Sequence, residues 1–128
     1  MKIKIACLNV QGCNEPAKRE CVGRLFEDRG LDVLVLSETK FKGKGEWKFG
    51  NVVGRVSGVS SGWAREGVCI IVGESWKGCV REWKEVSSRL MYVRMKVGMD
   101  KYVIVGAYGP GSERMKEERE NFWSDLGE

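Results

Sequence analysis

The chain has 128 residues, of which 42% are hydrophobic and 31% are charged, and its net charge is +4 at pH 7. These values are typical of one small globular domain and do not suggest a disordered chain. The longest apolar runs have about five residues, whereas a membrane span needs roughly twenty, so we expect neither a membrane span nor a secretory signal peptide. The positive charge suits a polyanionic partner, and equally a slightly basic solvated surface.

The thiols and the absence of histidine limit the possible chemistry. Five cysteines form no Cys-x-x-Cys pair, and there is no histidine. Without a secretory signal we expect reduced thiols in an intracellular protein, nuclear or cytoplasmic. Cys7, in a strand pattern, and Cys21, on an apolar helix face, are expected to be buried, while Cys13 lies in a loop and can be exposed. Ser–His and Cys–His nucleophilic pairs and His-ligated zinc are excluded within these residues.

The first forty residues predict a strand, a crossover helix and a second strand. Residues 2–10 alternate charged and apolar side chains and then become apolar, as in a strand that begins near the surface and runs inward. Asn14 is expected to cap a helix with Pro16 in its first turn and Gly30 at its left-handed C-terminal position. Residues 32–37 contain a continuous apolar run at 33–36, which suits a strand covered on both faces. The apolar face of the helix comprises Cys21, Val22, Leu25 and Phe26.

The remaining chain predicts further strands and one more helix. Residues 40–62 are rich in glycine, serine and lysine and are expected to be loop, apart from a short strand at 51–56. Strands are expected at 67–72, 78–86, 89–97 and 102–108, the last two as an antiparallel hairpin. A helix capped by Ser112 is expected to follow, and no repeat or linker divides the chain, so residues 1–128 are expected to form one domain. The apolar stripe of this last helix comprises Met115, Phe122, Trp123 and Leu126.

Polar residues close three of the predicted strands. Asn9 ends the first strand and Glu38 the second, and parallel strands joined by a helix end at the same edge, where α/β proteins place ligand sites. One carboxylate and one amide oxygen suit Mg²⁺, which keeps several waters, although a glutamate at a strand end is more often solvated or salt-bridged. Tyr108 closes the last strand, where its hydroxyl can bind a phosphoryl oxygen or simply face water.

The segment after Glu38 mixes lysines with aromatic residues. Lys40 and Lys42 lie next to Phe41, and cations interleaved with aromatics suit nucleic-acid backbones and stacked bases. A charge-rich loop is usually no more than a soluble connection. Together with Arg65, which precedes a predicted strand, these two lysines are the candidate substrate-binding cations.

Four segments of the chain resemble the endonuclease/exonuclease/phosphatase superfamily. Residues 5–12 (IACLNVQG) are similar to its opening strand, and residues 35–40 (VLSETK) look like its second motif. Residues 66–71 (EGVCII) resemble its glycine-led inner strand, and residues 103–110 resemble the strand that ends in its active-site tyrosine. Within the superfamily, residues 14–19 and 88–90 are most similar to endonucleases of non-LTR retrotransposons and to craniofacial-development-protein-like sequences derived from them.

The resemblance implies a fold and a set of roles. The implied fold is α/β: the N-terminal half of a two-sheet, DNase I-like sandwich, with a mixed sheet and two main helices. Glu38 would ligate Mg²⁺ or Mn²⁺, and Asn9 would help to orient the metal or the attacking group. Lys40 would lie beside the metal, Tyr108 would contact the scissile phosphate, and DNA would be the substrate of the parent enzyme.

The resemblance also implies sequence motifs that are absent from these 128 residues. The superfamily has an Asp-x-Asn motif and a Ser-Asp-His motif further along, and neither occurs here. We therefore expect a truncated domain that lacks its second sheet, binds metal weakly or not at all, and has little activity alone. The sheet face thereby uncovered is an expected site of self-association. The alternatives are a non-catalytic remnant that binds nucleic acid or protein, and a fragment of a phosphoesterase acting on another phosphoester.

Overall fold

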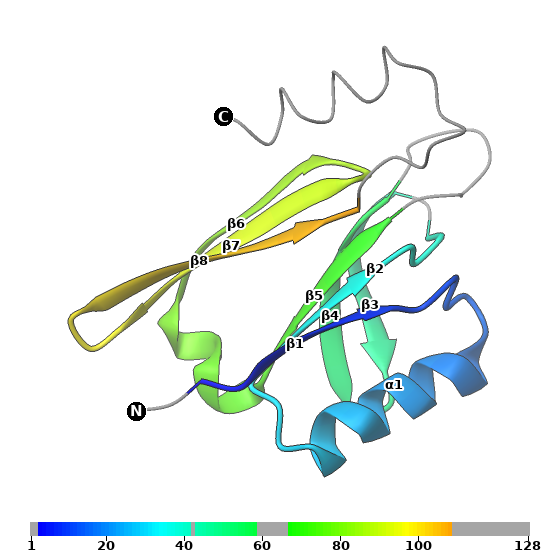
Figure 1. The fold of residues 1–128 in the computed structure, drawn as a ribbon, viewed down its shortest axis with the longest axis horizontal. Helices are drawn as coiled ribbons and strands as arrows, with labels where there is room; N and C mark the ends of the chain where they lie inside the picture. Colours follow the sequence, from blue (N-terminus) through cyan, green and yellow to red (C-terminus); the bar gives the residue numbers. More distant parts are fainter. Residues whose placement is uncertain (1–2, 42, 59–66, 109–128) are drawn as a thin grey trace.

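The structure is a computed structural model that describes residues 3–41, 43–58 and 67–108. It has three layers (Figure 1): helix α1 (Pro16–Asp28) packs on one face of a five-stranded sheet, and a three-stranded sheet packs on the other. The larger sheet contains, in spatial order, β1 (Ile5–Asn9), β2 (Val33–Ser37), β5 (Val68–Val72), β4 (Val52–Ser57) and β3 (Lys44–Phe49). The smaller sheet contains β6 (Val80–Ser87), β7 (Leu90–Val97) and β8 (Asp100–Ala107), and the short 3-10 helix η1 (Glu74–Cys79) leads into it.

The predicted strand–helix–strand unit is confirmed. β1 pairs with β2 in parallel, Pro16 is the first residue of α1, and Gly30 adopts φ +60° just after the helix. The prediction that Asn14 caps the helix is wrong, because the N-cap position is Glu15 and no side chain caps it. Proline at the first helical position leaves one N–H fewer to satisfy, and the Asn14 amide instead donates to the carbonyl of Lys40 at 2.9 Å.

β1 does not run into the interior as predicted. Among the described residues it pairs with β2 alone and so forms an edge of the sheet. Ile5 is 48% exposed and Leu8 36% exposed. β2 is buried through Leu36 as predicted, because α1 covers one of its faces and the smaller sheet covers the other.

The region predicted to be mainly loop contains an additional strand. β3 pairs with β4 as an antiparallel hairpin whose turn includes Gly50 at φ +63°. Phe49 is fully buried, and Trp47 stacks on Phe41 with ring centroids 4.4 Å apart. The many glycines and lysines mask this strand in the sequence, because tertiary packing of two aromatic residues outweighs local propensity.

The expectation that the second sheet is missing is wrong. The predicted hairpin of β7 and β8 is confirmed and, with β6, forms a sheet that buries Met91, Val93 and Ile104 against Val35 and Ile70. The main sheet is thus not open on this face, and its exposed large apolar residues lie on the two edge strands: Ile5 and Leu8 on β1 and Trp47 on β3.

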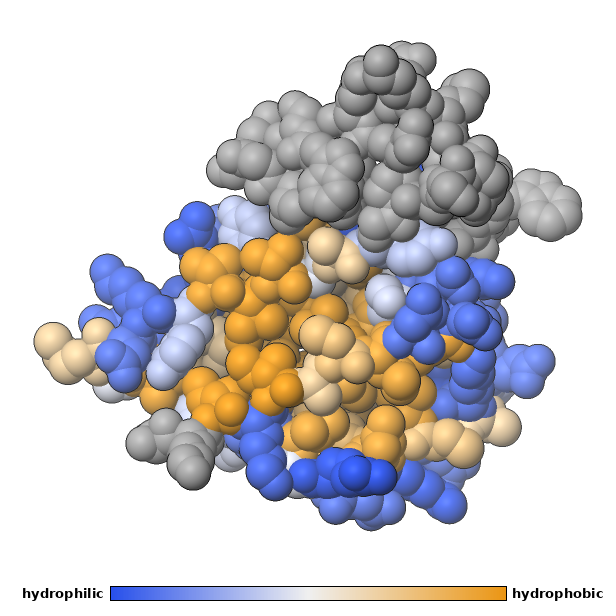
Figure 2. Space-filling model, in the orientation of Figure 1, coloured by the Kyte–Doolittle hydropathy of each residue, from blue (hydrophilic) through white to orange (hydrophobic). Residues whose placement is uncertain are grey.

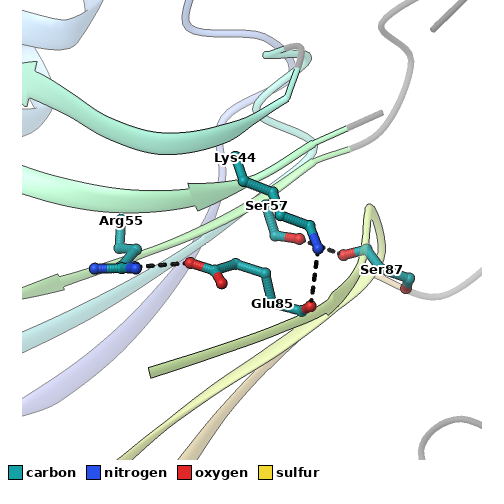
Figure 3. A network of polar contacts seen from close by, with 5 residues as sticks. All are labelled: Lys44, Arg55, Ser57, Glu85 and Ser87. Atoms are coloured by element: carbon teal, nitrogen blue, oxygen red, sulfur yellow. Dashed lines mark hydrogen bonds and ion pairs between the residues drawn. The ribbon is translucent and has the colours of Figure 1, made fainter. Parts of the chain in front are cut away.

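Polar contacts join the two sheets at one end (Figure 3). Arg55 on β4 donates from Nε to a Glu85 carboxylate oxygen on β6 at 2.7 Å, and Lys44 donates to the Glu85 carbonyl at 3.3 Å. The Ser57 hydroxyl donates to the Ser87 carbonyl at 2.6 Å. These three contacts fix the smaller sheet against β3 and β4.

All three expectations for the cysteines are wrong. Cys7 and Cys21 are exposed, whereas Cys13 is buried. Cys7 is exposed because β1 is an edge strand, and Cys13 is covered where its loop folds over the end of β2. The predicted helix at 112–126 lies outside the described residues. No helix in the described part of the chain is long and apolar enough to cross a membrane.

Candidate active site

The loop after β1 is hydrogen-bonded to three consecutive backbone carbonyls of the segment after β2. The N–H of Gly12 donates to the carbonyl of Glu38 at 2.6 Å, and that of Cys13 donates to the carbonyl of Thr39 at 3.0 Å. The Asn14 side chain binds the next carbonyl, that of Lys40. The carboxyl ends of both strands are thus held together at one rim of the sheet.

Several residues at this rim have a left-handed backbone conformation. Gln11, Glu38 and Lys40 have φ values of 50°, 55° and 60°, and they are the non-glycine residues with positive φ in the described chain. Such conformations cost free energy and gather at functional sites, where the surrounding structure enforces them. Here the tied carbonyls supply that constraint.

Thr39, between two of these residues, is held beneath Gly67. The Thr39 N–H donates to the Gly67 carbonyl at 3.1 Å, and a Cβ on Gly67 would clash with the Thr39 hydroxyl. Thr39 is fully buried, and the described residues offer its hydroxyl no hydrogen-bond partner. Only a glycine at position 67 allows the chain before β5 to approach the turn this closely.

Glu38 and Tyr108 meet across the two sheets. The Tyr108 hydroxyl donates to a carboxylate oxygen of Glu38 at 3.0 Å, although the residues are 70 positions apart. The Tyr108 N–H donates to the carbonyl of Arg89, which holds the end of β8 against the start of β7. Two of the residues singled out in the sequence therefore form one partly buried pair.

Asn9 lies beside this pair on the neighbouring strand. It is level with Ser37 in the parallel ladder, one residue before Glu38. Its amide oxygen accepts the N–H of Gln11 at 3.1 Å, and its side chain is exposed. The described contacts include no direct bond between Asn9 and Glu38.

The candidate cations are only partly described. Lys40 is half-buried, and its aliphatic stem packs on Gly12, where a Cβ would lie 3.2 Å from Lys40 Cδ. Lys42 and Arg65 lie outside the described residues. The structure therefore brings one of the three predicted cations to the rim.

Arg19 contributes to the site and was missed in the sequence. Its guanidinium lies 5.0 Å from the Trp47 ring centroid and 5.9 Å from that of Phe41, and it donates to the carbonyls of Cys13 and Asn14. It thereby joins α1 to the loop after β1. The sequence feature that could have indicated Arg19 was its position in the first turns of a helix that follows this loop.

Cys13 is unsuited to nucleophilic chemistry. Desolvation by burial raises the pKa of its thiol to about 11, although the charges of Arg19 and Lys18 oppose this shift. A thiol needs a low pKa to react as thiolate. Cys13 is therefore a packing residue.

The residues at the rim fit a hydrated magnesium ion and no closed metal cage. The described chain contains no group of three or more histidine, cysteine, aspartate or glutamate side chains that could enclose a metal. Glu38 gives one carboxylate oxygen to Tyr108, and the described residues give its second oxygen no partner. One carboxylate with several waters and a substrate phosphate is a common environment for Mg²⁺.

Comparison with known proteins supports the fold through solved structures. No protein-family model matches the chain, and no curated protein matches it. The AP endonuclease LMAP from Leishmania major has a similar structure, with a TM-score of 0.62 and 17% identity over 94% of this chain and 44% of that protein. An AP endonuclease from Archaeoglobus fulgidus also gives a TM-score of 0.62 at 17% identity, over 98% of this chain and 49% of that protein.

The chain thus spans about half the length of these neighbours. At this identity the likeness concerns the fold, which includes both sheets and the parallel β1–β2 pair. The chain therefore has the mixed α/β, DNase I-like fold of the endonuclease/exonuclease/phosphatase proteins, to which AP endonucleases belong.

Proposed function

We propose that this chain is the N-terminal part of a metal-dependent phosphodiesterase domain that acts on DNA, and that it descends from a retrotransposon-type endonuclease. The observation that carries the proposal is the contact of Glu38 with Tyr108 at the strand ends. The similarity of residues 14–19 and 88–90 to retrotransposon endonucleases supports the proposed descent. The structural neighbours, both AP endonucleases, support DNA as the substrate class.

Each residue at the rim would have a distinct task. Glu38 would hold Mg²⁺ or Mn²⁺, which in such sites offsets negative charge on a phosphate. The Tyr108 hydroxyl, which donates to the Glu38 carboxylate, would orient that carboxylate and would contact a phosphate oxygen. Lys40 would add positive charge beside it, and Asn9 would orient the metal-bound group.

The chain alone is proposed to be inactive or nearly so. It has no histidine and contains neither the Asp-x-Asn nor the Ser-Asp-His motif, in which the resemblance implies the general base. Loss of a general base typically lowers the rate about 10²–10⁴-fold. Metal binding and catalysis therefore need separate tests.

Metal binding is tested by electron paramagnetic resonance of free Mn²⁺ titrated with the protein. Glu38→Gln should weaken Mn²⁺ binding about 10-fold or more, since it removes the charged ligand. Glu46→Gln, on the exposed strand β3, is the matched control and should bind as the native chain does. Equal binding by native protein and Glu38→Gln would contradict the metal assignment.

Activity is tested with supercoiled plasmid and with a duplex that contains an abasic site, each with Mg²⁺. We expect no nicking that depends on Glu38. Robust nicking by the native chain and none by Glu38→Gln would refute the proposed inactivity while supporting the site. Hydrolysis of a non-nucleotide phosphoester alone would favour the other phosphoesterase class.

A further inference from the structure

Exposed apolar side chains lie at both edges of the main sheet, and the two edges differ. Figure 2 shows apolar residues gathered across the middle of the face in view, where β1 and β8 lie in Figure 1. The chain spans about half of its structural neighbours, so the rest of the proposed domain is the expected cover for the edge at β1. Trp47 lies on β3, the other edge strand of the described sheet, and is 37% exposed. The strands β2, β5 and β4 separate it from β1, so a strand added at β1 would not cover it.

The Trp47 ring is held in place from its inner side. Trp47 and Phe49 share the helix-side face of β3, since alternate residues of a strand point the same way and Phe49 belongs to the core beneath α1. The Trp47 ring stacks on that of Phe41, which is fully buried, with centroids 4.4 Å apart and an angle of 7° between the planes. The Arg19 guanidinium lies 5.0 Å from the Trp47 centroid and 5.9 Å from that of Phe41, so it sits beside the stacked pair and not over the outer face. The described contacts thus leave the outer face of a fixed ring open, and a second ring can stack there with little loss of side-chain freedom.

Positive side chains lie next to the stacked pair along the chain. Arg19 contacts both rings, Lys18 precedes it on α1, and Lys40 precedes Phe41. Lys18 and Arg19 donate to backbone carbonyls of the loop after β1, and none of the three cations belongs to an ion pair of the described residues. Carbonyls are neutral, so the positive charge of these side chains stays available to an anion.

Acidic residues of the same elements are directed mainly elsewhere. Glu46 lies on the opposite face of β3 from Trp47, because the two are adjacent in the strand. Glu20 is paired with Arg24 at 3.1 Å. Glu15, exposed at the start of α1, is outnumbered by the three cations. The surface around the Trp47 ring is therefore positive, which fits a polyanion.

This surface adjoins the rim that carries Glu38. Phe41 follows Glu38 by three residues, which span at most about 11 Å, and the Trp47 ring stacks on Phe41. Arg19 binds the loop after β1, and that loop in turn binds the carbonyls of residues 38–40. A nucleotide strand with a phosphate at Glu38 would therefore reach Trp47 within a few nucleotides.

We propose that Trp47 is a stacking platform for an unpaired base of a DNA strand, and that Lys18, Arg19 and Lys40 bind the phosphates of that strand. Stacking of bases on aromatic rings beside cations is a common mode of single-strand binding and tolerates any base sequence. A base inside a duplex is covered on both faces by its neighbours, so only an unpaired base can stack here. The inference rests on the proposed function and narrows its substrate from DNA to DNA with an unpaired base near the cleaved phosphate.

Fluorescence anisotropy in the presence of EDTA tests the platform without any metal. The probes are a labelled thymidine octamer and a labelled octamer in which tetrahydrofuran replaces every base, so that only the bases differ. The native chain should bind the thymidine octamer about 10-fold more tightly, since stacking on one aromatic ring favours the oligomer that has bases. Trp47→Leu, which keeps an apolar side chain against Phe41, should bind both octamers equally, whereas Trp47→Phe should retain part of the preference.

Two further variants separate stacking from charge and from general packing. Lys18→Gln should weaken the binding of both octamers by the same factor and lower its salt dependence. Trp83→Leu is the matched control, since Trp83 lies on the other sheet and also beside an arginine, with the Arg55 guanidinium 5.6 Å from its ring centroid. It should keep the native preference for bases. Binding of a long duplex should depend on Lys18 and not on Trp47.

Equal binding of both octamers by the native chain, or no binding of either, would overturn the proposal. A preference for bases that survives Trp47→Leu in a protein folded by circular dichroism would also overturn it. If Trp47→Leu is poorly folded, Trp47→Phe decides through its reduced preference, and an unreduced one counts against the platform. The metal assignment is tested separately, because Glu38→Gln should bind the octamers as the native chain does, so either result can fail while the other stands.

Discussion

At the scale of single residues, the pair of Glu38 and Tyr108 is the feature on which the functional assignment depends. The contact is one hydrogen bond from a phenol to a carboxylate at 3.0 Å. Bonds to charged groups contribute more than neutral ones when they are shielded from water. This bond also links the end of β8 to the end of β2.

We expect Tyr108→Phe to lower the free energy of unfolding by about 1 kcal/mol, because the Glu38 carboxylate loses its donor in a partly buried position. Urea denaturation measures this change. Tyr92→Phe is the matched control, since the ring of Tyr92 contacts Arg94. An equal loss in both variants would show that the Tyr108 hydroxyl has no special role.

Gly67→Ala is expected to lower the free energy of unfolding by about 1–3 kcal/mol, since its Cβ would clash with the Thr39 hydroxyl and φ is +125°. Gly98→Ala shares the positive φ, at +61°, and has open space around its Cβ. Gly98→Ala should therefore lower the free energy of unfolding by less, about 1 kcal/mol. Thermal melts compare the two, and relief of the Gly67→Ala defect by Thr39→Ala would identify the clash as the cause.

At the scale of elements, the contacts in Figure 3 hold the two sheets together. Burial alone would raise the pKa of Glu85, but the hydrogen bond and charge of Arg55, with smaller help from Lys44, lower it below its ordinary value of 4.5. A carboxylate with a lowered folded-state pKa stabilises the fold above its unfolded-state pKa. This contribution is lost as the pH falls through the folded-state value.

Arg55→Ala should therefore lower stability by about 1–2 kcal/mol near neutral pH, between the values for surface and buried pairs. It should also make stability fall less steeply as the pH drops below 4.5, the ordinary pKa of this carboxyl group. Urea titrations at several pH values test both effects. Arg24→Ala, which breaks an exposed pair with Glu20 on α1, should change stability little, and an equally steep acid loss in Arg55→Ala would exclude the proposed cause.

At the scale of the whole molecule, the reactivity of the buried thiols measures how often the whole fold opens. Cys21 is exposed, while Cys13 and Cys69 are buried and their pKa values are raised by desolvation. Cys13 belongs to the core on the helix side of the main sheet, together with Cys69. Neither thiol can react while this core is closed.

We expect a thiol reagent to modify Cys21 rapidly and Cys13 and Cys69 only at the rate of unfolding. Mass spectrometry of the labelled protein distinguishes these sites. Urea should accelerate the slow sites and leave the fast site unchanged. Fast labelling of Cys13 in native conditions would mean that the loop after β1 opens without the rest of the fold.

The sequence by itself determined the elements whose patterns are local. The parallel β1–β2 unit follows from a continuous apolar run and a helix flanked by Pro16 and Gly30, and the β7–β8 hairpin follows from strict alternation. The class of fold and the residues at the strand ends could be identified from the same segments. Their catalytic and metal-binding roles stay predictions.

Only the tertiary structure decided what each element touches. β3 was missed because its aromatic residue Trp47 is held by contacts outside the strand, with Phe41 in the preceding loop and with Arg19 on α1. The contact of Glu38 with Tyr108, the burial of Cys13 and the exposed edge of β1 depend on the order of strands and on the packing of two sheets. Burial and contact arise between segments distant in the chain, so local patterns do not specify them.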